Sequence, residues 1–169
     1  MTPQGLADEL SKAIHEGNFE ATQKLLSEDA DPLHALSSPI LGTSALETAI
    51  TRANRTGDTI FLRLILDQLQ TEGRLEALLH SDEKYHPLLQ NVCINGFQGE
   101  NFEALELLLE YGISLTQTQL MQIQITLSHE GILASEEFYK KLEVALENSK
   151  KRLKKKSKLR IFSFFSCFS

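Results

Sequence analysis

The 169-residue sequence predicts an all-α fold built from stacked pairs of short helices, and three observations support this prediction. A segment that begins at Asn18 recurs almost unchanged at Asn101. Apolar residues in both copies are three and four positions apart, and glycines separate each segment from an apolar stretch upstream of it. Apolar residues at that spacing share one side of a helix, so each segment predicts a helix that packs on its neighbours.

The internal repeat is the strongest of these signals. Residues 18–26 read NFEATQKLL and residues 101–109 read NFEALELLL, so the two copies share NFEA and the closing pair of leucines. A weaker third copy at residues 57–66, GDTIFLRLIL, keeps the apolar positions and changes the polar ones. Repetition at this scale is typical of helical repeat proteins.

Each copy has a predicted antiparallel partner upstream. The partners are residues 6–14, 45–53 and 88–94. The glycines between the partners are Gly17, Gly57, Gly96 and Gly99. Because a helix end often needs a left-handed residue, this placement predicts three helical hairpins.

These residues resemble the ankyrin-repeat family. Residues 10–31, LSKAIHEGNFEATQKLLSEDAD, resemble the second half of an ankyrin repeat, with Asp29, Ala30 and Asp31 where the family has Gly-Ala-Asp. Residues 42–50, GTSALETAI, resemble its TPLHxA opening, and residues 107–115 resemble its close. The resemblance implies a helical-hairpin solenoid of about three degenerate repeats, because the turn glycines are more widely spaced than the family's period of about 33 residues.

A capping helix pair is predicted to close the stack. It comprises residues 116–127 and a helix from about Glu136, with Ser135 as the N-cap. The apolar face of that helix is predicted to consist of Phe138, Leu142, Ala145, Leu146 and Leu153. The predicted ion pairs along it are Glu136 with Lys140, Glu137 with Lys141, and Glu147 with Lys151.

Charge divides the chain into two parts. The net charge is −6, yet all 23 acidic residues precede residue 150, together with 9 of the 17 basic residues. Residues 1–149 therefore carry a net charge of −14, the 9 cations less the 23 anions, while residues 150–169 carry the other 8 cations. We predict a helical repeat domain over residues 1–149 and a flexible, polybasic and aromatic tail over residues 150–169.

The tail has the composition of a membrane-binding segment. A polybasic run is attracted to an anionic leaflet, and phenylalanines that insert into it add hydrophobic binding. The predicted membrane-binding residues are Lys150, Lys151, Arg152, Lys154, Lys155, Lys156, Lys158, Arg160, Phe162, Phe164, Phe165 and Phe168. Cys167 is a candidate for lipidation by palmitoylation, but its place as third residue from the end does not fit prenylation.

Three other interpretations of the tail remain open at this point. It is also consistent with a solvated basic run, a segment that folds back on the acidic body, or a transport address. The run KKRLKKK resembles a nuclear localisation signal, and such a patch would contact nucleic acid nonspecifically. Neither role needs the phenylalanines, so membrane contact is favoured and nucleic acid is not expected as a partner.

No motif indicates catalysis. The sequence has no CxxC, HExxH or GxxxxGK motif, and its histidines are scattered, so we expect no enzyme, metal or cofactor. Cys93 sits beside Val92 and Ile94 and is predicted to be a buried structural thiol. Its distance from Cys167 in the sequence argues against a disulfide and favours a reducing compartment. Residues 1–10 lack the basic start and apolar run of a conventional secretory signal, and no stretch approaches the roughly 20 apolar residues of a spanning helix.

Together these observations predict a monomeric, non-enzymatic adaptor in the cytoplasm, held at the cytosolic face of a membrane by its tail. Its protein partner is expected to contact the links between units, here residues 29–36 and 112–116. The chain also resembles small ankyrin-repeat effector proteins of intracellular bacteria, which implies export into a host cell. The alternatives are a nuclear or nucleic-acid-associated regulator and an enzyme with an unrecognised active site.

Overall fold

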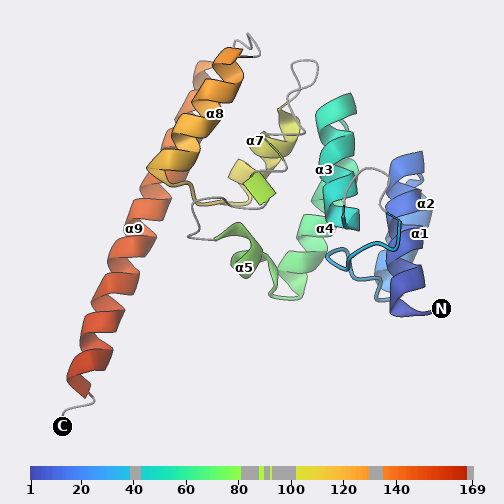
Figure 1. Ribbon diagram of the computed structural model, residues 1–169, viewed down its shortest axis with the longest axis horizontal. Coiled ribbons are helices and arrows are strands. Elements are labelled where there is room, and N and C mark those ends of the chain that lie inside the picture. Colours follow the sequence, from blue (N-terminus) through green and yellow to red (C-terminus); the bar gives the residue numbers. More distant parts are fainter. Residues whose placement is uncertain (39–42, 81–87, 90–91, 93–101, 130–134, 167–169) are drawn as a thin grey trace.

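The computed structural model describes residues 1–38, 43–80, 88–89, 92, 102–129 and 135–166. Over these residues the regular structure is helical and contains no strand, which confirms the predicted all-α class (Figure 1). The helices are α1 (Pro3–Glu16), α2 (Phe19–Ser27), α3 (Ala45–Thr56), α4 (Ile60–Thr71), α5 (Leu75–Leu79), α7 (Glu103–Glu110), α8 (Gln117–His129) and α9 (Glu136–Ser166).

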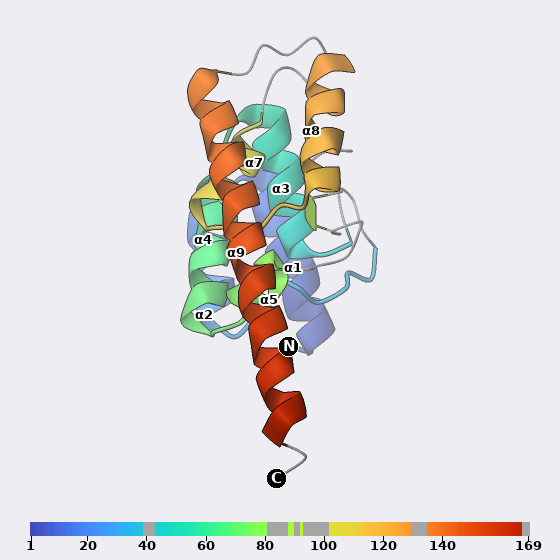
Figure 2. The same ribbon diagram turned by 90° about the vertical axis from the view of Figure 1, so that its left-hand side faces the viewer.

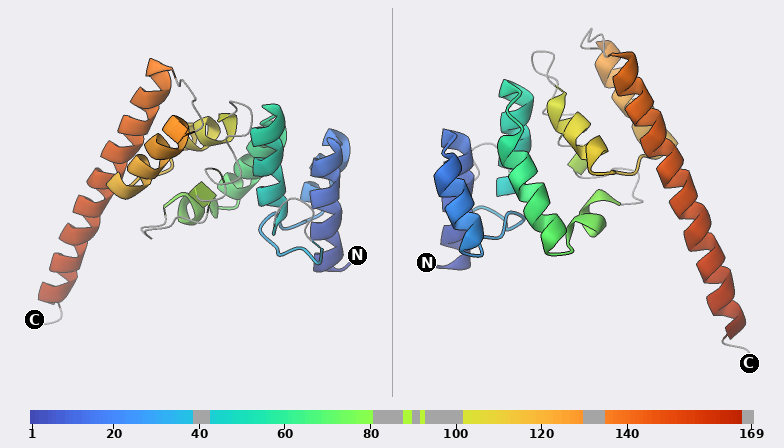
Figure 3. Two further views of the ribbon diagram at one scale, coloured as in Figure 1. Left: turned by 45° about the horizontal axis from the view of Figure 1, so that its top comes forward. Right: turned by 180° about the vertical axis from the view of Figure 1, so that it is seen from behind.

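The helices follow one another in a row from the N-terminus to the C-terminus. Helix α1 packs on α2, and α3 packs on α4. The two pairs meet through contacts of α1 with α3 and of α2 with α4, and the row continues through α3, α7 and α9, with α8 beside α9. Figure 3 shows this order from behind, with the earliest helices at one side and α9 at the other. Each pair therefore buries its apolar face against the next pair.

Side-chain caps fix where several helices begin. The Thr2 hydroxyl accepts a hydrogen bond from the Gly5 N–H at 3.1 Å, and the Asn18 side chain accepts one from the Ala21 N–H at 3.0 Å. The Ser135 hydroxyl accepts one from the Phe138 N–H at 3.1 Å, which confirms Ser135 as the predicted cap of α9. These bonds satisfy amides that have no partner within the first turn of a helix.

The first two predicted turn glycines end helices in the left-handed conformation. Gly17 has φ 75° after α1, and Gly57 has φ 73° after α3. The Asn18 N–H reaches back to the Ala13 carbonyl at 2.8 Å, which satisfies one of the last carbonyls of α1. Gly96 and Gly99, and most of the predicted partner helix over residues 88–94, lie outside the described residues.

One continuous core runs through the row. Residues of α1, α3, α4, α7 and α9 share it, and each is at most 1% exposed: Ile14, Ile50, Leu66, Leu105 and Leu142. A pair of buried hydroxyls lies in this core where α1 meets α3: Ser11 Oγ is 2.8 Å from Thr48 Oγ1. Because these two groups satisfy each other, they favour one register of α1 on α3.

The C-terminal helix differs most from the prediction. The predicted flexible tail is helical, since α9 continues without a break to Ser166. Its first half packs on the body through Phe138 and Leu142, and the Phe138 ring centroid lies 4.6 Å from that of Phe102. Its second half extends past the other described helices, as Figures 1 and 2 show. Lysine, arginine and leucine are good helix formers, and residues 136–166 contain no glycine or proline to stop the helix.

Two of the three ion pairs predicted along α9 involve other partners. Glu136 does pair with Lys140, at 2.9 Å. Lys141, however, reaches across to Glu106 on α7 at 3.3 Å, and Glu147 bonds Lys150 at 2.9 Å. The hydrogen bond from Lys150 lowers the pKa of the Glu147 carboxyl.

Between α4 and α7 the structure contains a helix that the sequence did not predict. Residues 70–79 lie outside the three predicted hairpins, and they include the end of α4 and the short helix α5, whose Leu75 and Leu79 are buried. Gly73, with φ 71°, makes the turn between them. The extra residues therefore add to the core.

Gly17 offers a test of how the first two pairs are joined. A Cβ atom at Gly17 would lie 2.7 Å from Nη2 of Arg52, whose guanidinium donates to the His15 carbonyl at 3.2 Å and to Asp58 at 3.0 Å. A Cβ atom at Gly73 would meet nothing within 4 Å. Gly73→Ala should therefore lower the free energy of unfolding by about 1 to 2 kcal/mol, the cost of a left-handed alanine. Gly17→Ala should lower the free energy of unfolding by about 1 kcal/mol more than Gly73→Ala does, because Arg52 must move and its hydrogen bonds weaken.

Urea unfolding followed by circular dichroism measures both variants, and Arg52→Ala provides the control background. The excess cost of Gly17→Ala should disappear when Arg52 is absent. If the two alanine substitutions lower the free energy of unfolding equally when Arg52 is present, Arg52 does not couple the first two helix pairs.

Candidate functional site

The first predicted partner-facing link, residues 29–36, has a fixed backbone. Asp29 has φ 63°, the left-handed conformation, directly after α2. The Ala30 N–H then donates to the Leu25 carbonyl at 3.1 Å, and Ala30 is buried. Asp31 accepts a hydrogen bond from the Leu33 N–H at 3.0 Å, which closes a local turn. The link thus leaves α2 along a defined path.

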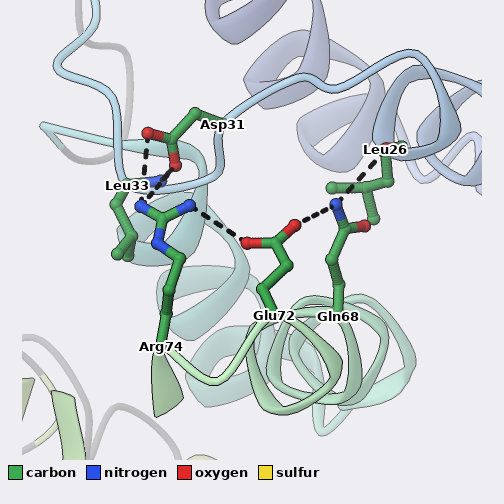
Figure 4. A network of polar contacts seen from close by, with 6 residues as sticks. All are labelled: Leu26, Asp31, Leu33, Gln68, Glu72 and Arg74. Carbon is green, nitrogen blue, oxygen red and sulfur yellow. Dashed lines mark hydrogen bonds and ion pairs between the residues drawn. The ribbon is translucent and has the colours of Figure 1, made fainter. Parts of the chain in front are cut away.

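A polar network ties this link to the end of α4 (Figure 4). Arg74 Nη2 contacts both carboxylate oxygens of Asp31, at 3.0 and 3.3 Å, and Arg74 Nη1 contacts Glu72 at 3.1 Å. Glu72 accepts from Gln68 at 2.8 Å, and the same Gln68 nitrogen donates to the Leu26 carbonyl at 3.3 Å. The side chains of Arg74 and Asp31 are 40% and 42% exposed, so solvent screens the pair and its main effect is to position the link.

The far end of the link is held by α1 and by the residues before α3. The Ser37 N–H and hydroxyl both donate to Asp8, at 2.9 and 2.7 Å, and Gln4 donates to the Ala35 carbonyl at 2.8 Å. The backbone hydrogen bond from Ser37, followed by that from its hydroxyl, lowers the pKa of the Asp8 carboxyl. The Leu36 N–H donates to the Thr43 carbonyl at 2.9 Å. A partner would therefore meet a link that is already ordered.

The second predicted link, residues 112–116, is largely covered. Ile113 and Leu115 are completely buried, and Ser114 is 9% exposed. The Ser114 N–H donates to the Leu79 carbonyl at 3.3 Å, and its hydroxyl contacts Nδ1 of His80. This link therefore closes the body between α5 and α9, and it offers a partner much less surface than the first link.

A shallow cavity of about 300 Å³ lies beside the second link. His80 and Tyr111 are among its lining residues, and the nearby contact of His80 with Ser114 is the kind of pair from which a nucleophile and base can be built. Burial of Ser114 gives this contact a structural role instead, since the pair fastens the link to the end of α5. Within the described part of the chain, no group of three histidine, cysteine, aspartate or glutamate side chains is placed to hold a metal ion.

The tail residues lie together on one helix. Lys150, Lys151 and Lys154 are exposed on α9, beyond the last residues that pack on the body. The other predicted membrane-binding residues that fall within the same helix are Arg152, Lys155, Lys156, Lys158, Arg160, Phe162, Phe164 and Phe165. Cys167 and Phe168 lie outside the described residues. No helix in the described ranges is both long enough and apolar enough to cross a membrane.

Comparison with known proteins gives no relative: no family model, no curated protein and no solved structure matches this chain. The resemblance to ankyrin repeats therefore stays a prediction, based on the quoted residues.

One exposed apolar surface was missed at the sequence level. Met121 and Ile125 of α8 are 53% and 54% exposed, although their spacing is that of packing residues. Residues 117–128 contain no Asp, Glu, Lys or Arg. This lack of charge is the sequence signal that α8 has apolar residues on two faces.

Tyr111 gives the body a pH-dependent contact. Burial, together with a hydrogen bond that its hydroxyl donates to Asp67, raises the pKa of Tyr111 to about 12. The folded state therefore keeps the phenol proton at pH values where the unfolded chain, with its tyrosine pKa near 10.0, has lost it. The contribution of this contact is complete below pH 10 and is lost as the pH rises towards 12.

Tyr111→Phe should lower the free energy of unfolding by roughly 1 kcal/mol at pH 8, because it removes one hydrogen bond. Between pH 10 and 11.5 the wild-type protein should lose stability more steeply than the variant, so the difference between their free energies of unfolding should become smaller. Urea unfolding at a series of pH values measures this. Parallel pH profiles for the two proteins would contradict the proposed contact with Asp67.

Proposed function

We propose that this chain is a non-enzymatic adaptor whose helical body binds a protein partner and whose C-terminal tail attaches it to an anionic membrane surface. The observation that carries the proposal is the second half of α9, a helix that leaves the acidic body and bears every cation after residue 149. We further propose that it acts in the cytoplasm, at the cytosolic face of a membrane, and that it reaches a host cell as a bacterial effector does.

The distribution of charge along α9 supports separation of the tail from the body. A helix turns by about 100° per residue, so the eight cations of residues 150–160 are distributed around its whole circumference. Residues 150–160 therefore offer the body no continuous apolar face, in contrast to the face that contains Phe138 and Leu142. At a rise of 1.5 Å per residue, the segment 150–166 extends about 24 Å. An anionic leaflet would attract this segment and repel the body, whose net charge is −14.

The aromatic end of the tail supplies the apolar part of the proposed attachment. Ile161, Phe164 and Phe165 follow the spacing i, i+3, i+4, which places apolar residues on one side of a helix. Each phenylalanine that inserts fully contributes about 1.5 to 3 kcal/mol, and each nearby cation contributes about 1 kcal/mol. Acylation of Cys167 would add a second anchoring signal at the same end of the tail.

The helical body fits the proposed ankyrin-like solenoid in two respects. In the first two pairs α1 contacts α3 and α2 contacts α4, which is the stacking expected of repeated hairpins. Asp29 also adopts a left-handed conformation at the position where the family has glycine. We therefore propose that the ordered first link, residues 29–36, contributes to the protein-binding surface.

Vesicle binding by the full chain tests the membrane proposal. Wild-type protein should float with vesicles that contain anionic phosphatidylserine and should not float with neutral phosphatidylcholine vesicles. High salt should weaken the binding, because it screens the cations. Replacing Phe162, Phe164, Phe165 and Phe168 with serine should reduce the bound fraction at least tenfold even at low salt, because the inserted apolar surface is lost.

Ile60→Ser is the matched control, since it removes an exposed apolar side chain from α4 and should leave vesicle binding unchanged. Equal binding to neutral and anionic vesicles, or no effect of the four serines, would contradict the proposal. Binding to duplex DNA without binding to vesicles would instead support the nuclear alternative.

A further inference from the structure

Helix α8 has two apolar faces, and the body covers one of them. Leu120, Ile123 and Leu127 are buried against the rest of the chain. Met121 and Ile125 point the other way and are more than half exposed. These two side chains, with Gln124 and Ser128, line a shallow depression of about 400 Å³.

The exposed residues of α8 follow the spacing of a coiled-coil seam. Thr118, Met121, Ile125 and Ser128 are separated by three, four and three positions, which matches alternating a and d positions of a heptad. All four are exposed. A β-branched isoleucine at an a position favours two-stranded pairing, and the depression beside Ile125 resembles the hole that receives a partner's side chain.

The position of α8 leaves this seam accessible. Helices α8 and α9 form the last layer of the described row, and Figure 2 views this end, with α8 beside α9. Over the described residues, α8 contacts α9, and Met121 and Ile125 of the seam remain more than half exposed. A terminal layer normally has a polar outer face, as α1 does at the other end with Glu9 and Lys12 exposed.

We propose that this seam, defined by Thr118, Met121, Ile125 and Ser128, binds the same seam of a second copy of the chain and so forms a two-fold dimer. In a two-fold contact each residue faces residues of its own kind, so a charged face repels itself. Bodies with a net charge of −14 would repel each other at most surfaces. The seam and its flanking Gln117, Gln122 and Gln124 have no charged side chain, and a glutamine amide both donates and accepts hydrogen bonds.

The lack of flanking charge also favours self-association over a different partner helix. Charged residues at the positions beside a seam normally select a complementary partner and exclude others. The neutral glutamines beside this seam do not repel the same helix of a second copy. The contact spans fewer than two heptads and buries little surface, so the dimer is weak and forms only at high protein concentration. This dimer replaces the monomer predicted from the sequence.

Sedimentation equilibrium of the full chain, in reducing buffer and without lipid, tests the proposal. The mass should rise from 19.0 kDa towards twice that value as the protein concentration approaches about 1 mM. The double variant Met121→Gln, Ile125→Gln should weaken the association at least tenfold. Both positions are exposed and glutamine is a good helix former, so the thermal melt should match that of the wild type.

Two further variants separate the seam from other sources of association. Ile60→Gln changes an isoleucine on α4 that is 47% exposed, close to the exposure of Ile125, and this variant should dimerise like the wild type. The variant with serine at Phe162, Phe164, Phe165 and Phe168 should also dimerise, so the result does not depend on membrane binding. A wild-type chain that stays at 19.0 kDa, a seam variant that still dimerises, or dimerisation that requires the tail phenylalanines would each overturn the proposal.

Discussion

The arrangement of the whole molecule depends on how far the apolar face of α9 extends. Phe138, Leu142 and Ala145 are buried and close the end of the core, and the Phe138 ring packs at a tilt against Phe102, the residue before α7. After Leu146, which is half-buried, the helix continues with cations in place of apolar residues. The same helix therefore acts first as a cap for the body and then as a charged extension that the body cannot cover.

Polar contacts between successive helix pairs set their register, while the apolar core supplies most of the stability. Four contacts link elements far apart in the sequence: Ser11 with Thr48, Arg52 with His15, Arg74 with Asp31, and Lys141 with Glu106. Most of these groups are partly exposed, so each contributes on the order of 1 kcal/mol or less. Their shared effect is to hold the first link in place and to position α9 on α7. The proposed adaptor thus has an ordered binding surface at one part of the body and an extended tail at the other end.

Local sequence signals predicted the all-α class, the first two hairpins, the turns at Gly17 and Gly57, and the Ser135 cap, because each depends on residues within one or two helical turns. Contacts between distant elements were not predictable in the same way. Lys141 has a suitable partner at Glu137, yet α7 brings Glu106 within reach, and spacing along one helix contains no information about that choice. The charged tail was expected to be flexible, although its residues are good helix formers that continue an existing helix. The second apolar face of α8 was missed, because apolar spacing alone does not tell which side of a helix the body covers.

Amide hydrogen exchange of the full chain, with and without anionic vesicles, tests the central claim most directly. If the second half of α9 is the membrane-binding element, amides of residues 150–166 should exchange more slowly on the vesicles, because binding stabilises the helix against opening. Amides of the body, from α1 to α8, should exchange at the same rates in both conditions. Protection that appears over the body while residues 150–166 stay unchanged would contradict the division of α9 into a packed cap and a membrane-binding extension.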